Sequence, residues 1–214
     1  MTRNHLLIVF SIAAVSALCL ASLLLSNDGQ TSSAESRLPA LSDDSAEVTA
    51  SLPLFHRVSD LYTRGAQPNH GGVIVLSRLG VKTIVDLRSE YDHTDDASRA
   101  AARLGLAYHW MPMSVWEPPT DIQTAEFLKL VTDSSKGPFF VFCADGVNRT
   151  GEMTAIYRVA HDHWNVEQAL KEADDAGFGP YYWNLRQYVW TYARKFQPVA
   201  VPKEGRALSM TEKD

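Results

Sequence analysis

Cys143 and Arg149 are the residues best suited to chemistry, and they stand six positions apart in the stretch PFFVFCADGVNRTGEM. A wholly apolar run ends at the cysteine, a short turn containing Gly146 follows, and a helix is predicted to begin near Thr150. Backbone amides of such a turn point at one spot, which also feels the positive end of the helix dipole. The stretch therefore predicts an anion-binding loop that carries a thiol.

Phosphoryl transfer is the reaction that this loop predicts. A helix N-terminus and a nearby arginine stabilise a thiolate, so Cys143 is expected to be a nucleophile. Arg149 carries a planar fork of donors that fits two phosphate oxygens, and Thr150 could help the sulfur to depart from a phosphocysteine. Arginine and backbone amides supply the positive charge, so no metal or other cofactor is expected. The predicted substrate-binding residues are Ala144, Asp145, Gly146, Val147, Asn148 and Arg149.

The segment CADGVNRT resembles the signature of the cysteine-dependent protein tyrosine phosphatase superfamily: Cys, five residues, Arg, then Ser or Thr. Upstream, LYTRGAQP, LGVKTIVDLR and HWMPMSVWEPPT look like successive landmarks of the atypical dual-specificity phosphatases of bacteria, plants and fungi. The resemblance covers residues 52–197. It implies hydrolysis of phosphotyrosine or a similar phosphomonoester.

Two departures from this family pattern bear on catalysis. Phe142 stands where a histidine usually precedes the nucleophile, so we expect the thiol to ionise less readily than in relatives. Relatives often place an acidic proton donor shortly before the Pro-Pro pair, where this chain has Ser114 and Val115. The usual general acid is therefore missing.

Three other carboxylates could protonate the leaving oxygen. Asp145 and Glu117 rank equally, and Asp121 ranks below them because a carboxylate at a helix start is more often structural. Asp145 also lies inside the phosphate loop, where its charge disfavours polyphosphorylated ligands. Arg64 and Arg88 belong to the upstream landmarks, and we expect structural roles for both, such as pairing with Asp86.

Three alternatives to a protein phosphatase stay open at this point. Phe142 and the absent acid are compatible with a catalytically weak phosphate-binding pseudophosphatase. A membrane anchor would favour a lipid phosphatase, since a tethered site meets membrane substrates at high effective concentration. A sulfurtransferase also uses a cysteine-centred anion loop, but the spacing of Gly146, Arg149 and Thr150 disfavours it.

Alternating apolar and amphipathic stretches predict a single α/β domain with a mostly parallel central sheet flanked by helices, as in protein tyrosine phosphatases. The predicted strands are 56–64, 81–88, 106–111 and 138–142, and the predicted helices are 72–79, 95–104, 120–132, 150–163, 166–176 and 180–196.

The N-terminal run from Leu6 to Leu25 is apolar and uncharged, which predicts a transmembrane helix. Arg3 before it and acidic residues after it would keep the N-terminus in the cytoplasm and the domain outside, in the periplasm if the source is bacterial. A cleaved signal segment, giving a secreted protein, is the competing interpretation. The predicted organisation is an anchor or signal at 1–25, a flexible tether at 26–51, a phosphatase-like domain at 52–197 and a disordered tail at 198–214.

Composition excludes several other classes of protein. The chain has 214 residues and a net charge of −5, without the basic surface that nucleic-acid binding requires, so no nucleic acid is expected as a partner. Its two cysteines cannot build a disulfide framework or a multi-cysteine zinc site. The expected partners are a phosphorylated protein or lipid substrate, and the membrane through the N-terminal helix.

Overall fold

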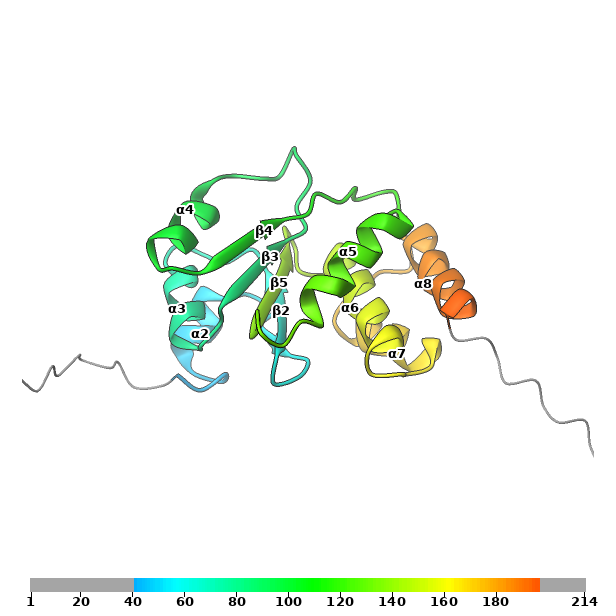
Figure 1. Cartoon of the computed structure of the whole chain (residues 1–214), viewed down its shortest axis with the longest axis horizontal. Helices are drawn as coiled ribbons and strands as arrows, with labels where there is room; N and C mark the ends of the chain where they lie inside the picture. The colour runs from blue at the N-terminus through cyan, green and yellow to red at the C-terminus, as the bar shows by residue number, and fades with distance from the viewer. Residues whose placement is uncertain (1–40, 197–214) are drawn as a thin grey trace, which may run out of the picture. The chain divides into compact units, whose positions relative to one another are not determined.

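The computed structural model of the protein describes residues 41–196, in which helices and strands alternate along most of the chain (Figure 1). The elements in chain order are α2 (Ala46–Ser51), β1 (His56–Arg57), β2 (Tyr62–Ala66), α3 (Gly72–Arg78), β3 (Thr83–Asp86), α4 (Asp96–Arg103), β4 (Ala107–Trp110), α5 (Asp121–Val131), β5 (Phe139–Cys143), α6 (Asn148–Ala160), α7 (Val166–Asp175) and α8 (Trp183–Phe196).

The strands form one five-stranded sheet in the order β1-β2-β5-β3-β4. The pairs β2–β5, β5–β3 and β3–β4 are parallel, and only β1 pairs antiparallel, with β2. The central strand β5 is buried along its whole length, which suits its wholly apolar sequence between two layers of helices. The predicted α/β architecture is confirmed, with a mixed sheet.

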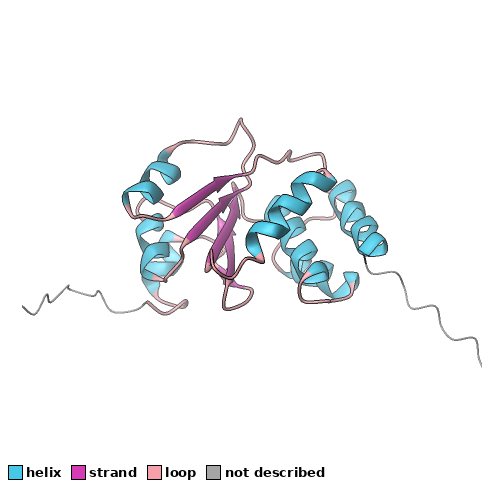
Figure 2. Ribbon diagram, in the orientation of Figure 1, coloured by secondary structure: helices cyan, strands magenta, loops and turns pink. Residues whose placement is uncertain are grey.

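Side chains of β5 alternate between two hydrophobic clusters, one on each face of the sheet. Phe140 and Phe142 pack in the cluster that includes Val48 of α2 and Leu76 of α3. Phe139, Val141 and Cys143 belong to the cluster that holds the buried side chains of α5, α6, α7 and α8. Figure 2 shows these two groups of helices on opposite sides of the strands. The alternation therefore turns the cysteine toward the α6 side.

The prediction of one strand over residues 56–64 was wrong. The segment forms two short antiparallel strands, β1 and β2, joined by a turn in which the backbone N–H groups of Val58 and Ser59 both donate to the carbonyl of Tyr62. Strand periodicity alone does not reveal a turn made without glycine or proline.

The last part of the predicted tether is folded. Ser45 caps α2 by accepting a hydrogen bond from the Val48 backbone N–H, and the side chains of Val48 and Leu52 are each 1% exposed. The low content of large apolar residues did not exclude a helix, because a helix this short needs only one buried side chain per turn to pack against α3. The remainder of that tether, residues 26–40, and the predicted tail at 198–214 lie outside the described residues.

The prediction of a transmembrane helix requires correction. None of the helices between residues 41 and 196 is long and apolar enough to cross a bilayer. The segment from Leu6 to Leu25, on which the prediction rested, lies outside the described residues. The assignment to a single-pass membrane protein with its domain outside the cytoplasm is therefore withdrawn.

Candidate active site

Cys143 lies at the carboxyl end of the central strand, where the upstream landmarks of the sequence come together. In the sheet register Cys143 is opposite Ala66 of β2, and Phe142 is opposite Asp86 of β3. Carboxyl ends of parallel strands share one edge of a sheet, and ligands of open α/β folds bind at that edge. The loops that follow β2, β3 and β5 therefore surround the cysteine.

The loop between β5 and α6 has free backbone donors. Within the described part of the chain, the N–H groups of Asp145, Gly146 and Val147 donate to no other protein group. Helix α6 begins at Asn148 rather than at Thr150, and no side chain caps its first turn. Arg149 thus lies in the first helical turn, and the loop amides are available to an anion as the sequence predicted.

Gly146 fits this loop for two reasons. Its φ angle of 69° lies in the left-handed region, which side chains with a Cβ disfavour. A Cβ at this position would lie 2.4 Å from the backbone nitrogen of Ala66 and 2.6 Å from the carbonyl oxygen of Gly65. The loop therefore rests directly on the end of β2, and only glycine allows that approach.

The two residues expected to carry the reaction are both buried. Cys143 is 2% exposed and Arg149 is 4% exposed. The Nη1 atom of Arg149 donates to Oδ2 of Asp92 at 2.8 Å, which fixes one edge of the guanidinium. Asp92 comes from the loop after β3, and it is a functional candidate that the sequence reasoning missed. The only available signal was a run of polar residues after the VDLR landmark.

Asp92 is itself held in place. Its carboxylate also accepts a hydrogen bond from the Ser89 hydroxyl at 3.0 Å. Burial acts to raise the pKa of Asp92, but the hydrogen bonds from Arg149 and Ser89 outweigh it, so the pKa lies below its usual value. Asp92 is therefore an anion at neutral pH and a lasting partner for Arg149.

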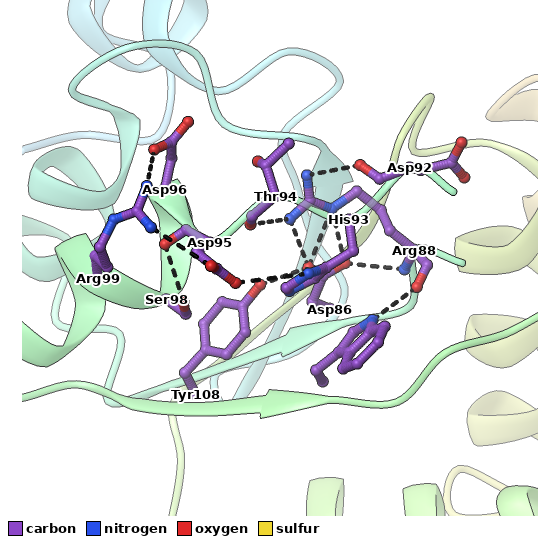
Figure 3. A network of polar contacts seen from close by, with 11 residues as sticks. Asp86, Arg88, Asp92, His93, Thr94, Asp95, Asp96, Ser98, Arg99 and Tyr108 are labelled. Atoms are coloured by element: carbon purple, nitrogen blue, oxygen red, sulfur yellow. Dashed lines mark hydrogen bonds and ion pairs between the residues drawn. The ribbon is translucent and has the colours of Figure 1, made fainter. Parts of the chain in front are cut away.

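A buried ion pair positions the loop that carries Asp92 (Figure 3). The guanidinium of Arg88 and the carboxylate of Asp86 are both fully buried and joined by three hydrogen bonds, of 3.0, 3.0 and 2.6 Å. Arg88 also donates to the backbone carbonyls of Asp92 and Thr94, and Tyr108 donates to Asp86. The expected structural pairing of Arg88 with Asp86 is confirmed, and it ties β3 to the active-site loop.

Arg64 supports the phosphate loop from the opposite side. Its side chain is 2% exposed, and Nη2 donates to the carbonyl oxygen of Gly146 at 2.7 Å. Burial lowers the pKa of Arg64, while Tyr62, Glu172 and Cys143 oppose that shift. Arg64 therefore has the structural contact with the phosphate loop that its bond to Gly146 shows.

Thr150 is fully buried, and its hydroxyl has no hydrogen-bond partner among residues 41–196. A buried hydroxyl without a partner is costly and uncommon in folded proteins. This side chain follows Arg149 in the first turn of α6. Its donor is therefore free for a group that enters the loop.

The three candidate proton donors differ in their surroundings. Asp145 and Glu117 are both exposed, Asp145 in the phosphate loop and Glu117 in the loop before α5. Asp121 is bound to Lys195 at 2.6 Å and to the Tyr188 hydroxyl at 3.2 Å, and these bonds lower its pKa. Asp121 is therefore engaged by Lys195 and Tyr188 at the start of α5.

The loop that holds Glu117 is fixed by hydrogen bonds within the loop and by contacts of Trp116. The Ser114 hydroxyl accepts hydrogen bonds from the backbone N–H groups of Trp116 and Glu117, both at 3.1 Å. Trp116 stacks on Tyr182 with ring centroids 5.6 Å apart, and Asn184 donates to the Trp116 carbonyl. Residues 114–117 thus contact the segment leading into α8, and Ser114 has a structural use where relatives often have an acid.

Comparison with known proteins gives a consistent result. Residues 53–184 match the family described as "DSP-PTPase phosphatase fused to NAD+ Kinase". A dual specificity protein phosphatase of Pseudomonas aeruginosa, TpbA, is 32% identical over 158 residues, which are 71% of this chain and 66% of that protein. The chain spans at most 66% of the length of the TpbA sequences that it matches.

Solved structures share the fold. The crystal structure of P. aeruginosa TpbA matches with a TM-score of 0.58 and 26% identity, over 72% of this chain and 92% of that chain. The core catalytic domain of the PP-IP phosphatase SIW14 from S. cerevisiae matches with a TM-score of 0.60, over 67% of this chain and 88% of that one. Its identity of 18% supports the fold alone.

Proposed function

The chain belongs to the family described as "DSP-PTPase phosphatase fused to NAD+ Kinase", and we propose that it hydrolyses phosphomonoesters through a phosphocysteine on Cys143. The observation that carries the proposal is the phosphate loop itself. A buried cysteine, free backbone amides and a buried arginine meet at one helix N-terminus. Together these groups match the charge that spreads over a transferring phosphoryl group.

In the first step the Cys143 thiolate attacks phosphorus, an S–P bond forms and the P–O bond to the leaving group breaks. The loop amides and Arg149 bind the three non-bridging oxygens throughout. A proton from a carboxylic acid neutralises the leaving oxygen, which departs as an alcohol or phenol. Positive charge comes from the protein's own donors.

In the second step water attacks the phosphocysteine, the S–P bond breaks, and inorganic phosphate and the thiolate are released. The partner-free hydroxyl of Thr150 supports a role here, because a hydrogen bond to the departing sulfur would stabilise its negative charge. The same acid, now ionised, would accept the proton from water.

Asp92 acts through Arg149 and is a positioning residue in this proposal. Its bond to Nη1 leaves the other edge of the guanidinium for phosphate, so the fork is oriented before the substrate arrives. Pre-orientation matters because a flexible arginine would lose conformational entropy on binding. The Arg88–Asp86 pair holds the backbone of the same loop.

Asp145 and Glu117 remain the proposed proton donors. Both are exposed, whereas Asp121 is held by Lys195. Asp145 is part of the phosphate loop, and Glu117 lies on a loop fixed by Ser114 and Asn184. Neither side chain is held in an ion pair within residues 41–196, which supports a role for one of them as the acid.

Phosphotyrosine in a protein is the proposed substrate. A TpbA variant has been crystallised in complex with pTyr, and its structure matches this chain with a TM-score of 0.55 and 25% identity. Trp116, which is 68% exposed, offers a flat apolar surface on the loop that carries Glu117. An aromatic leaving group would gain contact there.

The test is hydrolysis of 4-nitrophenyl phosphate by the full chain in EDTA, compared with Cys143→Ser. We expect turnover that EDTA does not affect and that falls about 10,000-fold in the variant, since a hydroxyl at this position is hardly ionised. Circular dichroism and phosphate binding serve as folding controls. Turnover retained by Cys143→Ser would overturn the proposal, and a folded wild-type protein that binds phosphate without turnover would indicate a binding protein instead.

A further inference from the structure

A second cavity lies behind the phosphate loop and is not used by the proposed reaction. Its volume is about 690 Å³, which suits a small organic ligand. It lies between the segment before and at the start of β1, Arg64 of β2, Gly146 of the phosphate loop, Trp164 in the loop before α7, and α7 itself. The lining residues that matter here are Leu54, Phe55, Arg64, Trp164, Lys171 and Glu172.

Arg64 is the feature of this cavity that calls for a ligand. The residue is 2% exposed, its Nη2 is bound to the Gly146 carbonyl, and its Nη1 is buried without a hydrogen-bond partner in the described part of the chain. A buried guanidinium N–H that lacks an acceptor is costly, more so than a neutral donor. Nη1 has almost no accessible surface, so an acceptor in the cavity would satisfy it once the Arg64 side chain turns toward the cavity.

The charged side chains that line the cavity are paired, except that Arg64 makes no ion pair with residues 41–196. Lys171 is paired with Asp175 at 2.8 Å, and Glu172 binds Arg158 through both of its oxygens. Within residues 41–196, Arg64 has no carboxylate within ion-pair distance. A ligand carboxylate in the cavity would therefore meet its best available donor at Arg64.

Part of the cavity wall is apolar. Leu54, Phe55 and Trp164 contribute side chains to it, and Leu54 is 58% exposed. Leu54 also has a φ angle of 54°, in the left-handed region that leucine disfavours. A strained backbone that presents an exposed apolar side chain at a cavity is typical of a ligand site.

We propose that this cavity binds a small amphipathic monocarboxylate. The apolar body would pack against Leu54, Phe55 and Trp164, and the carboxylate would accept a hydrogen bond from Nη1 of Arg64. A single negative charge is favoured over a phosphate dianion, because Arg64 offers one unpaired donor and Glu172 lies nearby. Since the same guanidinium holds Gly146, the ligand would lie next to the support of the phosphate loop.

The experiment titrates the full chain with 4-phenylbutyrate and follows backbone and indole N–H signals by NMR, with the Trp164 indole identified from Trp164→Phe. The matched control probe is 4-phenylbutyramide, which has the same body without the charge. We expect saturable shifts at Trp164 with a dissociation constant on the order of 1 mM, and about tenfold weaker binding of the amide. The shifts should persist in saturating orthovanadate, which occupies the phosphate loop.

Two variants locate the site. Arg64→Gln keeps a donor for the Gly146 carbonyl but removes the charge, and it should abolish the preference for carboxylate over amide. Leu54→Gly relieves the positive φ angle and removes apolar wall, so it should fold normally and bind both probes about fivefold more weakly. Ile122→Ala, which removes an exposed apolar side chain of α5 far from the lining residues, should leave binding unchanged.

The proposal is overturned if the Trp164 signal does not shift saturably, if the amide binds as tightly as the carboxylate, or if orthovanadate abolishes binding. Unchanged affinity in Leu54→Gly would also overturn it, and this variant decides the matter even if Arg64→Gln fails to fold. None of these measurements depends on catalytic activity, so their outcome is independent of the proposed phosphatase reaction.

Discussion

The two sides of the active site differ in how firmly the fold holds them. On the phosphate side, Cys143, Arg149 and Arg64 are each at most 4% exposed, and hydrogen bonds to Asp92 and Gly146 fix the two guanidinium groups. On the leaving-group side, Asp145 and Glu117 are exposed. The two sides lie around one loop but differ in burial and in the number of bonds that hold them.

This contrast follows from what each side must recognise. A phosphoryl group has one fixed geometry, and donors that stabilise its charge act best when preorganised and shielded from water. The leaving group varies with the substrate, and residues that contact it can change without disturbing the core. We expect substitutions on the phosphate side to affect every substrate, and those on the leaving-group side to affect only some.

Arg149→Lys should have the largest effect among charge-conserving changes. Lysine keeps the positive charge but loses the planar fork that binds two oxygens, so kcat/KM should fall about 1,000-fold for all phosphomonoesters. Steady-state kinetics on aryl and alkyl phosphates measure it. Arg99→Lys, an exposed arginine of α4, is the control and should match the wild type. A loss of activity on only one substrate would contradict the expectation that the phosphate side acts on every substrate.

Gly146→Ala should disrupt the phosphate side through the backbone. Strain at positive φ and the clash with Ala66 should together lower the free energy of unfolding by about 3 kcal/mol and kcat/KM by about 100-fold. Gly105→Ala is a matched control, because Gly105 has a φ of 70° but nothing within 4 Å of its Cβ position. Comparing the urea denaturation of the two variants separates the destabilisation caused by the positive φ angle from that caused by the clash with Ala66. Equal destabilisation in the two would mean that the close approach to β2 is unimportant.

Asp92→Asn should lower kcat/KM about 20-fold, since an amide holds Arg149 less strongly than a carboxylate does. The pKa of Asp92 is depressed in the folded protein, so its stabilising effect is present above its ordinary pKa and is lost as pH falls through the lowered value. The difference in Tm between wild type and variant should therefore be constant from about pH 8 to 5 and shrink below about pH 4. A difference that grows on acidification would contradict this role.

Glu117→Gln and Asp145→Asn should have the smallest effects and should discriminate between substrates. The variant that removes the proton donor should lose about tenfold on an alkyl phosphate, which needs protonation of its leaving oxygen. On 4-nitrophenyl phosphate, whose leaving group is stable as an anion, it should stay within about twofold of the wild type. Comparing the two substrates in both variants identifies the acid. Equal losses on both substrates would indicate a role in phosphate binding instead.

Local patterns allowed much of the fold to be predicted. The strand at 138–142 was recognisable because it is wholly apolar, and the helix at 120–132 because the Pro-Pro-Thr stretch at 118–120 is typical of a helix start. The hairpin of β1 and β2 and the helix α2 were not predicted. Both are short, and their few buried side chains are stabilised by contacts distant in sequence, which periodicity does not report.

The candidate site also contains residues that local patterns predict and residues that they do not. Cys143, Gly146, Arg149 and Thr150 fall within eight consecutive residues, so their spacing along one strand, turn and helix already predicted the anion loop. Asp92 could not be assigned, because its distance from Arg149 in the sequence is 57 residues and only the parallel pairing of β3 with β5 brings their loops together.

By itself, the sequence predicted a nucleophile, a phosphate clamp and the chemistry that they would support, because local backbone geometry follows from neighbouring residues. Tertiary structure alone decided which carboxylate orients Arg149, which one is committed to Lys195, and that Arg64 has an unpaired donor at a cavity. Those features depend on burial and on contacts between distant segments, and no local pattern encodes them.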